Sequence, residues 1–449
     1  MELFKKTILW FGASPPRTLL LGFSAVIMAG ALLLRLPIAT VSREPLSFVD
    51  ALFTATSAAC VTGLVLFDTG SYFSTFGHWV ILMLIQIGGI GFMTMATLFA
   101  LMLRRRISLK ERLILQESLN QGSIEGLVRL VRKVVLYALA LESVGAALFT
   151  ARFAADMPFG RAAYHGIFHA ISIFNNAGFD LSGNSGSFSE YSSDLYMNIV
   201  SMALIVLGGF GFIVLSDLFD IRRKTKFSLH TKVVLSVSAA LIVVGAVVIF
   251  IFEYTNARSI GGAGFGQKAL VSLFQSVTTR SGGVTTVDIS EFRQATQFFI
   301  VILMFIGASP GSTGGGIKTT TFAILVGAVL AMMRGKDDVV LFRMRLAQER
   351  VYKAVTVTLF CIGIVTLGTM ILATTEDAAF LSILFEATSA FGTVGLTMGL
   401  TEQLSLPGKL TIIFLMFAGR LGPLTLTYAL GPKPGRALYR HAEGKIIIG

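Results

Sequence analysis

The hydrophobic positions of this chain gather into long runs that no charged residue interrupts. A helix needs about 20 mostly apolar residues to cross the hydrocarbon core of a bilayer, and outer-membrane barrels lack such continuous runs. The pattern therefore predicts a helical membrane protein. The uninterrupted runs include 70–103, 195–216, 233–252, 295–317 and 354–375, and spanning helices are expected near 17–38, 78–103, 131–153, 195–217, 233–253, 296–333, 354–375 and 407–430.

Four segments between these spans resemble one another, and each carries a glycine at the same place. These glycines are Gly63, Gly178, Gly283 and Gly395, and they recur at near-equal intervals. A phenylalanine-containing stretch precedes each glycine and is too short to cross a bilayer. It can only dip into the membrane and return, and irregular backbone at that depth must line a cavity or be buried in protein. Each unit is therefore expected to be a span, a short outer helix, a glycine-containing loop and a second span.

Four such units use all the expected spans. The expected fold is an all-α polytopic membrane protein with four parallel helix–pore-loop–helix repeats around one pseudo-fourfold pore. Inverted repeats, by contrast, are typical of many transporters that rock around a central site. The repeats are expected at 1–125, 126–228, 229–345 and 346–449, where the third holds a Gly-rich intramembrane loop and the fourth ends in a cytoplasmic tail.

Composition and charge support this picture and orient it. Hydrophobic residues make up 54% of the chain and charged residues 14%, whereas a soluble domain carries about 25% charged residues. The net charge of +12 lies mainly in alternate loops, so the positive-inside rule places the basic loops and both termini in the cytoplasm. Because orientation explains the charge, no nucleic-acid partner is expected, and lipid is the expected surrounding in a bacterial inner membrane.

The glycine-containing loops have the chemistry of a cation pore. Backbone carbonyls from a ring of loops can replace the hydration shell of a potassium ion, and glycine accepts the unusual dihedrals that this requires. The preceding short helices direct their partially negative C-termini at the pore. The alternative is that the glycines only let helices pack closely. The expected lining residues, with potassium at their backbone carbonyls, are Val61, Thr62, Gly63, Asn176, Ala177, Gly178, Ser281, Gly282, Gly283, Thr393, Val394 and Gly395.

A Gly-rich segment interrupts the sixth expected span. It approaches the phosphate-loop pattern, but Ile317 separates the last glycine from Lys318, and a phosphate loop needs these two to be adjacent. A non-helical loop inside the membrane, below the pore loops, is expected instead, and a packing kink is the alternative. Arg420 in the last span either repels cations near this loop or braces it through backbone carbonyls. The expected gate residues are Gly311, Ser312, Thr313, Gly314, Gly315, Gly316, Lys318 and Arg420.

Two further charged positions stand out inside the membrane. Arg280 follows the third short helix and either opposes cations or pairs behind the loop with a carboxylate, Glu291 or Glu386. Glu142, in the middle of the third span, is expected to form a hydrogen bond between helices. No catalytic triad, metal-ligand set or disulfide framework is recognisable, so neither an enzyme nor a covalently bound cofactor is expected.

The sequence resembles the Trk/Ktr/HKT superfamily of potassium transporters, and most closely the membrane subunit of the bacterial Ktr type. The resemblance covers nearly the whole chain and is clearest at 84–94, 168–179 and 389–399. One departure is that Ser281-Gly282-Gly283-Val284 stands where relatives often have Thr-Ala-Gly-Phe, which leaves ion selectivity open.

The resemblance implies potassium uptake by a channel-like pore whose four filter glycines are those named above. It also implies an intramembrane loop under the filter that gates flow, and an arginine near this gate. Relatives form homodimers docked on a cytosolic ring of nucleotide-binding regulatory subunits, so the same partners are expected here. Whether sodium acts as an activator is left open, and a coupled transporter of organic solutes is the competing class.

Overall fold

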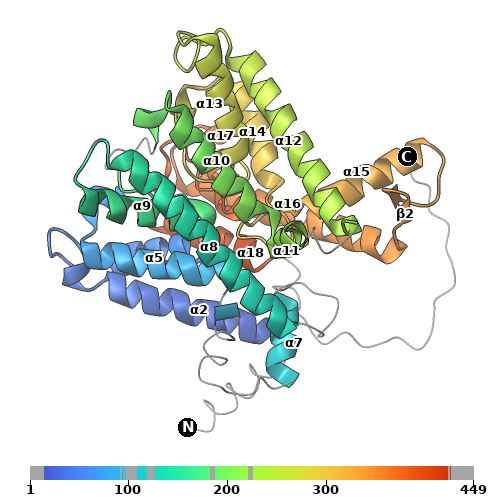
Figure 1. Cartoon of the computed structure of the whole chain (residues 1–449), viewed down its shortest axis with the longest axis horizontal. Coiled ribbons are helices and arrows are strands. Elements are labelled where there is room, and N and C mark those ends of the chain that lie inside the picture. Colours follow the sequence, from blue (N-terminus) through green and yellow to red (C-terminus); the bar gives the residue numbers. More distant parts are fainter. Residues whose placement is uncertain are drawn as a thin grey trace.

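The computed structural model describes residues 15–91, 94–95, 97, 109–118, 127–182, 188–220, 226–422 and 425, and its architecture is helical (Figure 1). Four units follow one another in the expected order. The first contains α2 (Pro15–Leu34), α3 (Phe48–Ala59), α4 (Thr69–Tyr72) and α5 (Thr75–Ile90), and α7 (Leu109–Ser118) follows it; the second contains α8 (Leu127–Phe153), α9 (Phe159–Phe174), α10 (Leu195–Phe210) and α11 (Phe212–Phe219).

The third and fourth units have the same plan, and a small hairpin joins them. The division of the chain into repeats at the boundaries given above stays a prediction. The third unit contains α12 (Leu229–Glu253), α13 (Phe265–Thr278), α14 (Gln294–Phe305) and α15 (Thr319–Met333), the antiparallel hairpin pairs β1 (Val340–Leu341) with β2 (Met344–Arg345), and the fourth unit contains α16 (Gln348–Thr375), α17 (Phe380–Gly392) and α18 (Leu406–Leu421).

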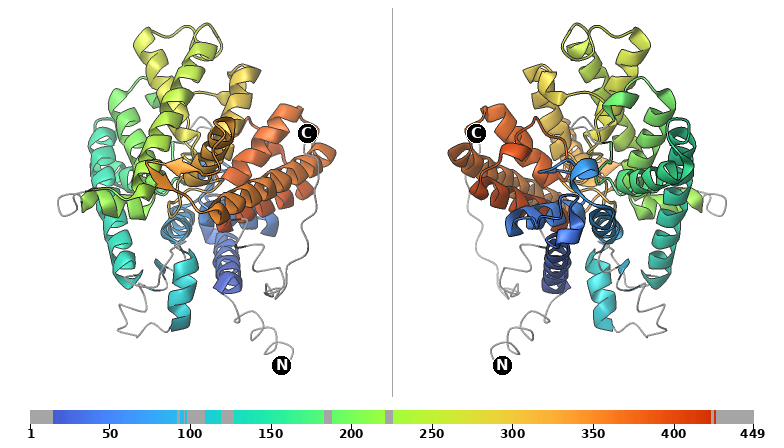
Figure 2. Two further views of the ribbon diagram at one scale, coloured as in Figure 1. Left: turned by 90° about the vertical axis from the view of Figure 1, so that its right-hand side faces the viewer. Right: turned by 90° about the vertical axis from the view of Figure 1, so that its left-hand side faces the viewer.

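The helices of a unit pack mainly on one another. In Figure 1, α2 and α5 run alongside each other, while α12, α13 and α14 form a second group. Figure 2 shows the group of the fourth unit, α16, α17 and α18, in orange to red, and the hairpin strand β1 against α15.

Short helices α3, α9, α13 and α17 occupy the inside of this arrangement. Each buries the phenylalanine that the sequence repeats, because the longer helices surround it. These side chains, Phe53, Phe168, Phe274 and Phe385, are at most 2% exposed. The long helices instead leave apolar side chains such as Leu136 and Leu367 exposed, as expected for surfaces that face lipid.

Local signals in the sequence explain where the helices begin. The side chains of Ser74, Asp194 and Ser405 accept hydrogen bonds from backbone N–H groups in the first turns of α5, α10 and α18. These residues are among the preferred N-caps because their oxygens satisfy donors that have no partner within the helix. The second long helix therefore begins in the same way in three of the four units.

Helices lie at all the predicted spans, and in the described part of the chain four of them, α2, α8, α12 and α16, are by themselves long and apolar enough to cross a membrane. The pair α10 and α11, bent by 104°, makes a fifth if the two are counted as one span. The span expected at 195–217 is present as this bent pair, and the bend occurs at Gly211, which has a φ of 88°. The span at 296–333 is broken between α14 and α15, as expected. The ends of the spans expected at 78–103 and 407–430 lie largely outside the described residues.

Candidate cation pathway

The four glycine-containing loops share one backbone signature. In each loop the glycine and the residue two positions before it both have positive φ, and the residue between them does not. A non-glycine residue in this region is uncommon and costs about 1–3 kcal/mol. The pairs are Val61 (58°) with Gly63 (90°), Asn176 (58°) with Gly178 (72°), Ser281 (76°) with Gly283 (72°), and Thr393 (48°) with Gly395 (87°). We call these segments the filter loops.

Backbone hydrogen bonds turn each filter loop back on the end of its short helix. The N–H before the glycine donates to a carbonyl five residues earlier in three loops, from Thr62 to Ser57 (2.8 Å), Ala177 to Ser172 (2.7 Å) and Val394 to Ser389 (2.9 Å). In the third loop Gly282 donates instead to Thr278, four residues earlier, at 2.7 Å. This loop therefore reaches the same dihedral signature through a different turn, at the place where its sequence departs from that of relatives.

The four glycines meet one another. A Cβ atom placed on Gly63 would lie 2.5 Å from the carbonyl oxygen of Ala177, and one on Gly178 would lie 2.8 Å from Cα of Gly283. A Cβ on Gly283 would lie 2.9 Å from the Val394 carbonyl oxygen, and one on Gly395 would overlap the Thr62 carbonyl oxygen. Loops from all four units thus converge, and none of the four sites has room for a side chain.

A second set of glycines brings the following helix close to each short helix. A Cβ on Gly88, Gly208 or Gly419 would overlap the carbonyl oxygen of Ala59, Phe174 or Phe391, respectively, near the C-terminal end of the short helix. This contact explains the Gly-containing stretches that recur in α5, α10 and α18. It also means that the second helix of these units passes directly against the start of a filter loop.

The Gly-rich segment lies against the filter loops as a non-helical loop, as expected. It connects Phe305 to Thr319, and its two ends are joined by a bridge between Ile306 and Ile317. Asn176 Nδ2 donates to Thr313 Oγ1 at 3.0 Å, and the Gly315 N–H donates to Thr393 Oγ1 at 2.8 Å.

Further contacts place the loop beside the third filter loop and the second unit. A Cβ on Gly314 would lie 2.7 Å from Ser281 Oγ. The backbone N–H of Phe212 donates to the Gly311 carbonyl at 3.0 Å, and the Thr313 N–H donates to the Gly208 carbonyl at 3.4 Å. The loop therefore contacts the first positive-φ residue of three of the four filter loops.

Two positively charged side chains donate hydrogen bonds to backbone carbonyl groups of this region. Arg420 donates through Nη1 to the Thr313 carbonyl and through Nη2 to the Gly88 carbonyl, so it connects the loop to α5. Lys318 Nζ donates to the Gly314 carbonyl at 2.6 Å. These bonds match the bracing alternative for Arg420. The Lys318 ammonium group bonds within its own loop, whereas the lysine of a phosphate loop contacts a bound phosphate.

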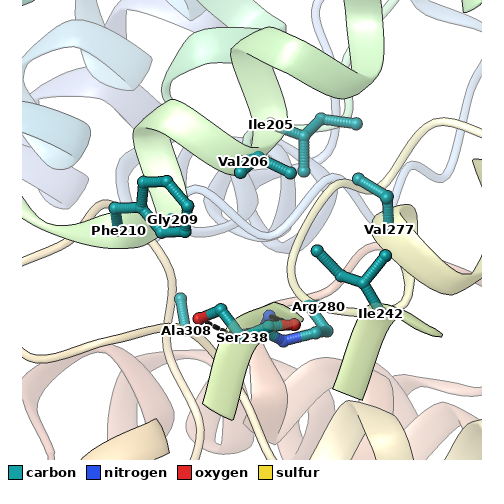
Figure 3. Close-up of a pocket in the computed structure, with 9 residues that line it drawn as sticks. All are labelled: Ile205, Val206, Gly209, Phe210, Ser238, Ile242, Val277, Arg280 and Ala308. Atoms are coloured by element: carbon teal, nitrogen blue, oxygen red, sulfur yellow. Dashed lines mark hydrogen bonds between the residues drawn. The ribbon is translucent and has the colours of Figure 1, made fainter. Parts of the chain in front are cut away.

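Among the described residues, which include Glu291 and Glu386, Arg280 pairs with no carboxylate, and this corrects the expectation of a partner in Glu291 or Glu386. Its guanidinium donates to the Ser238 carbonyl and to Ser238 Oγ, both at 3.3 Å, and Nε has no partner among the described residues. Glu386 is instead bonded by two threonines of its own unit. The Arg280 side chain lies at a cavity of about 20 Å³ between α10 and α12 (Figure 3). The other residues lining this cavity are Ile205, Val206, Gly209, Phe210, Ile242, Val277 and Ala308.

Glu142 forms hydrogen bonds between helices, as expected. Its oxygens accept from Gln86 Nε2 on α5, at 2.9 and 3.1 Å, and from Asn175 Nδ2 at 2.8 Å. Asn175 directly precedes the second filter loop, so the buried carboxylate supports that loop from behind. The sequence placed Gln86 in the stretch 84–94 that resembles the family but gave it no role, although an amide inside an uncharged run is a signal of one.

Comparison with known proteins places the chain in a family. The family model TrkH, described as a cation transport protein, matches residues 22–432. The chain belongs to this family. It is 43% identical over 444 residues to the Ktr system potassium uptake protein B of Bacillus subtilis, with 99% of each chain covered. It is 38% identical over 442 residues to the potassium/sodium uptake protein NtpJ of Enterococcus hirae, with 97% of each chain covered.

The fold is also that of a solved member of the TrkH family. The crystal structure of the potassium transporter TrkH from Vibrio parahaemolyticus matches with a TM-score of 0.73 and 18% identity, covering 92% of this chain and 84% of the other. The protein is therefore a multi-pass membrane transporter. The TrkH family transports cations and is not a family of enzymes, so the expected absence of catalysis is confirmed by its family.

Proposed function

We propose that the protein is the membrane subunit of a potassium uptake system and that its four filter loops form the selectivity filter of a channel-like pore. The repeated positive-φ pair in four converging loops carries this proposal. Such a backbone presents carbonyl oxygens that can replace the water around a potassium ion. The relatives from Bacillus and Enterococcus, named as potassium and potassium/sodium uptake proteins, support the same substrate.

Potassium is the transported ion, held by backbone carbonyls of the filter residues. The ends of α3, α9, α13 and α17 supply partial negative charge next to each filter loop, which favours a cation. Sodium enters the proposal as a candidate activator to be tested, and the Enterococcus relative is named as a potassium/sodium uptake protein. The third filter loop turns differently at Gly282. It is therefore the loop that we propose alters discrimination between potassium and sodium compared with that in relatives.

The Gly-rich loop is the proposed gate. It contacts three filter loops, and Arg420 holds it through the Thr313 carbonyl. Such a position obstructs the route on one side of the filter. Its glycines and Pro310 give up helix hydrogen bonds, and this makes a rearrangement less costly than melting a regular helix. Displacement of the loop would open the pore.

The protein is placed in the bacterial inner membrane, with its basic loops and both termini in the cytoplasm. A homodimer and a cytosolic ring of nucleotide-binding subunits are the proposed partners. The proposed docking region for the ring is the cytoplasmic side of the third and fourth units, where apolar side chains are exposed beside basic ones. The exposed apolar residues there include Met332, Met333, Val340, Phe342, Met344 and Tyr352.

Ion flux into proteoliposomes tests the proposal directly. We expect purified, correctly inserted protein to take up rubidium or potassium, to prefer these ions over sodium, and to exclude amino acids. Uptake should be measured with and without added sodium to identify activation. Well-folded protein that carries neither potassium nor rubidium would refute the proposed function.

A further inference from the structure

The residue directly after the buried phenylalanine is polar in all four short helices, and the proposed function has not used it. These residues are Thr54, His169, Gln275 and Glu386. All four are at most 3% exposed. A buried polar group costs free energy unless it is hydrogen-bonded, so its partner shows what the position does.

In the last three units this side chain binds the chain segment just beyond the filter glycine. His169 Nε2 accepts from the Leu181 N–H at 3.4 Å, three residues after Gly178. The other ring nitrogen, Nδ1, contacts the His165 carbonyl at 2.7 Å and must donate there, which leaves Nε2 free to accept. The tautomer that the Nδ1 bond requires is therefore the one that lets Nε2 accept from the Leu181 N–H.

The third and fourth units make the corresponding contact two residues after the glycine. Gln275 Nε2 donates to Thr285 Oγ1 at 2.6 Å. Glu386 accepts from Thr397 Oγ1 at 2.8 Å and from Thr401 Oγ1. The three side chains differ in chemistry, yet they reach the same part of the loop.

The first unit differs at this position. Thr54 Oγ1 donates only to the Asp50 carbonyl of its own helix, at 3.0 Å. Its filter glycine is held instead by Ser57, whose Oγ accepts from the Gly63 N–H at 3.1 Å. The first unit therefore provides an internal control, because the equivalent side chain does not reach the outgoing segment.

We propose that His169, Gln275 and Glu386 are positioning residues. Each holds the segment that follows the filter glycine in its own filter loop, and together they thereby set the preference for potassium over sodium. This inference rests on the proposed filter. The carbonyl ring can favour the larger ion only while its loops are prevented from closing around a smaller one. Within the described part of the chain, few backbone hydrogen bonds hold the segments that follow the filter glycines. Side chains rooted in the rigid short helices supply that restraint.

Glu386 is the most informative of the three. It is fully buried inside a membrane protein, and both of its oxygens accept from threonine hydroxyls rather than from a cation. Removing one partner of a buried hydrogen bond leaves the other unsatisfied, which is more costly than the bond itself is favourable. The substitution Glu386→Leu should therefore loosen the fourth filter loop.

The experiment compares rubidium and sodium uptake into proteoliposomes, per molecule of monodisperse, correctly inserted protein. We expect about a fivefold loss of rubidium preference in Glu386→Leu, as for the loss of about one hydrogen bond. Glu386→Gln should keep most of the preference, because the third unit already uses glutamine at this position. Thr54→Val, the matched control in the first unit, should leave the ratio unchanged.

A second variant changes the other partner of the hydrogen bond between Glu386 and Thr397. Thr397→Val removes one hydroxyl donor from a half-buried position, so it tests the contact even if Glu386→Leu does not fold. It should lower the ratio in the same direction, and the effects of the two substitutions should not add fully, because both remove the Glu386–Thr397 hydrogen bond.

The outcomes separate this inference from the proposed function. A selective wild type together with unchanged ratios in folded Thr397→Val and Glu386→Leu would overturn the positioning role alone. The same holds if Thr54→Val is as damaging as Glu386→Leu, or if Glu386→Gln is no better than Glu386→Leu. A wild type that carries neither potassium nor rubidium would overturn the filter itself.

Discussion

At the scale of the residue, backbone conformation decides most of the site. The four filter glycines have φ values from 72° to 90°, and a Cβ atom on any of them would lie within 2.8 Å of the backbone of a neighbouring loop. A side chain at these positions is unfavourable for two reasons. L-residues disfavour positive φ, and the backbone of neighbouring loops already fills the space that the side chain would need. In the proposed filter, the carbonyl groups of the loops, rather than any side-chain charge, are therefore expected to contact the ion.

Replacing any one filter glycine, for example Gly178→Ser, should reduce discrimination between potassium and sodium. The strain of a non-glycine residue at this φ is about 1–3 kcal/mol, which corresponds to roughly a 5- to 150-fold change in an equilibrium if it is relieved by a shift of the loop. Competition between rubidium and sodium in uptake assays measures the effect.

Gly262→Ser is the matched control, since this glycine lies in an exposed loop with open space around it. It should behave as the wild type. Discrimination that is unaltered in all four filter variants would contradict the filter assignment.

At the scale of the element, interrupted helices are as important as continuous ones. Gly91, Gly211 and Gly422 end the second helix in three units with φ values of 93°, 88° and 81°. In the remaining unit the interruption is the Gly-rich loop between α14 and α15. Arg420, one residue after the close-contact Gly419, stands where α5 has Gly89 and connects that loop to the first unit.

Shortening the segment 311–316 should raise potassium flux, because the obstruction below the filter is removed. Arg420→Ala should act in the same direction, since the loop then loses a charge-assisted hydrogen bond of about 1.5–3 kcal/mol that holds it to its neighbours. Flux at matched protein amounts is the measurement.

The control variant for this comparison is Thr411→Ala, on the same helix as Arg420. Its hydroxyl bonds only to the Pro407 carbonyl within α18, so flux should stay at the wild-type level. If folded protein of both the shortened and the Arg420→Ala variants carries no more potassium than the wild type, the loop is structural and the gate lies elsewhere.

At the scale of the whole molecule, the charge pattern and the units agree on one orientation. The positive-inside rule predicts that each unit begins and ends on the cytoplasmic side, with all four filter loops toward the other side. The loop before α13 and the hairpin after α15 should therefore be exposed on opposite faces of the membrane.

Cysteine labelling in intact cells tests this topology. A membrane-impermeant maleimide should label Gly262→Cys from outside and should label Lys336→Cys only after the cells are opened. Both sites are exposed. The native cysteines provide a low background, because Cys60 and Cys361 are at most 1% exposed and unpaired. Labelling of Lys336→Cys in sealed cells would reverse the assigned orientation.

The sequence by itself determined the class of protein, the order of the elements and the positions of the four glycines. These properties are local: the length of an apolar run decides whether a helix can span, and a required dihedral decides where glycine must stand. Hydropathy could not predict the bend at Gly211, because the apolar run continues through it without a change in composition.

Only the tertiary structure decided which polar groups meet. Arg280 bonds to Ser238 on α12 and not to a glutamate, and Glu386 takes two threonines. Buried polar groups bind whichever partners the packed helices bring within about 3 Å. That choice depends on contacts between segments far apart in the chain, which no local pattern encodes.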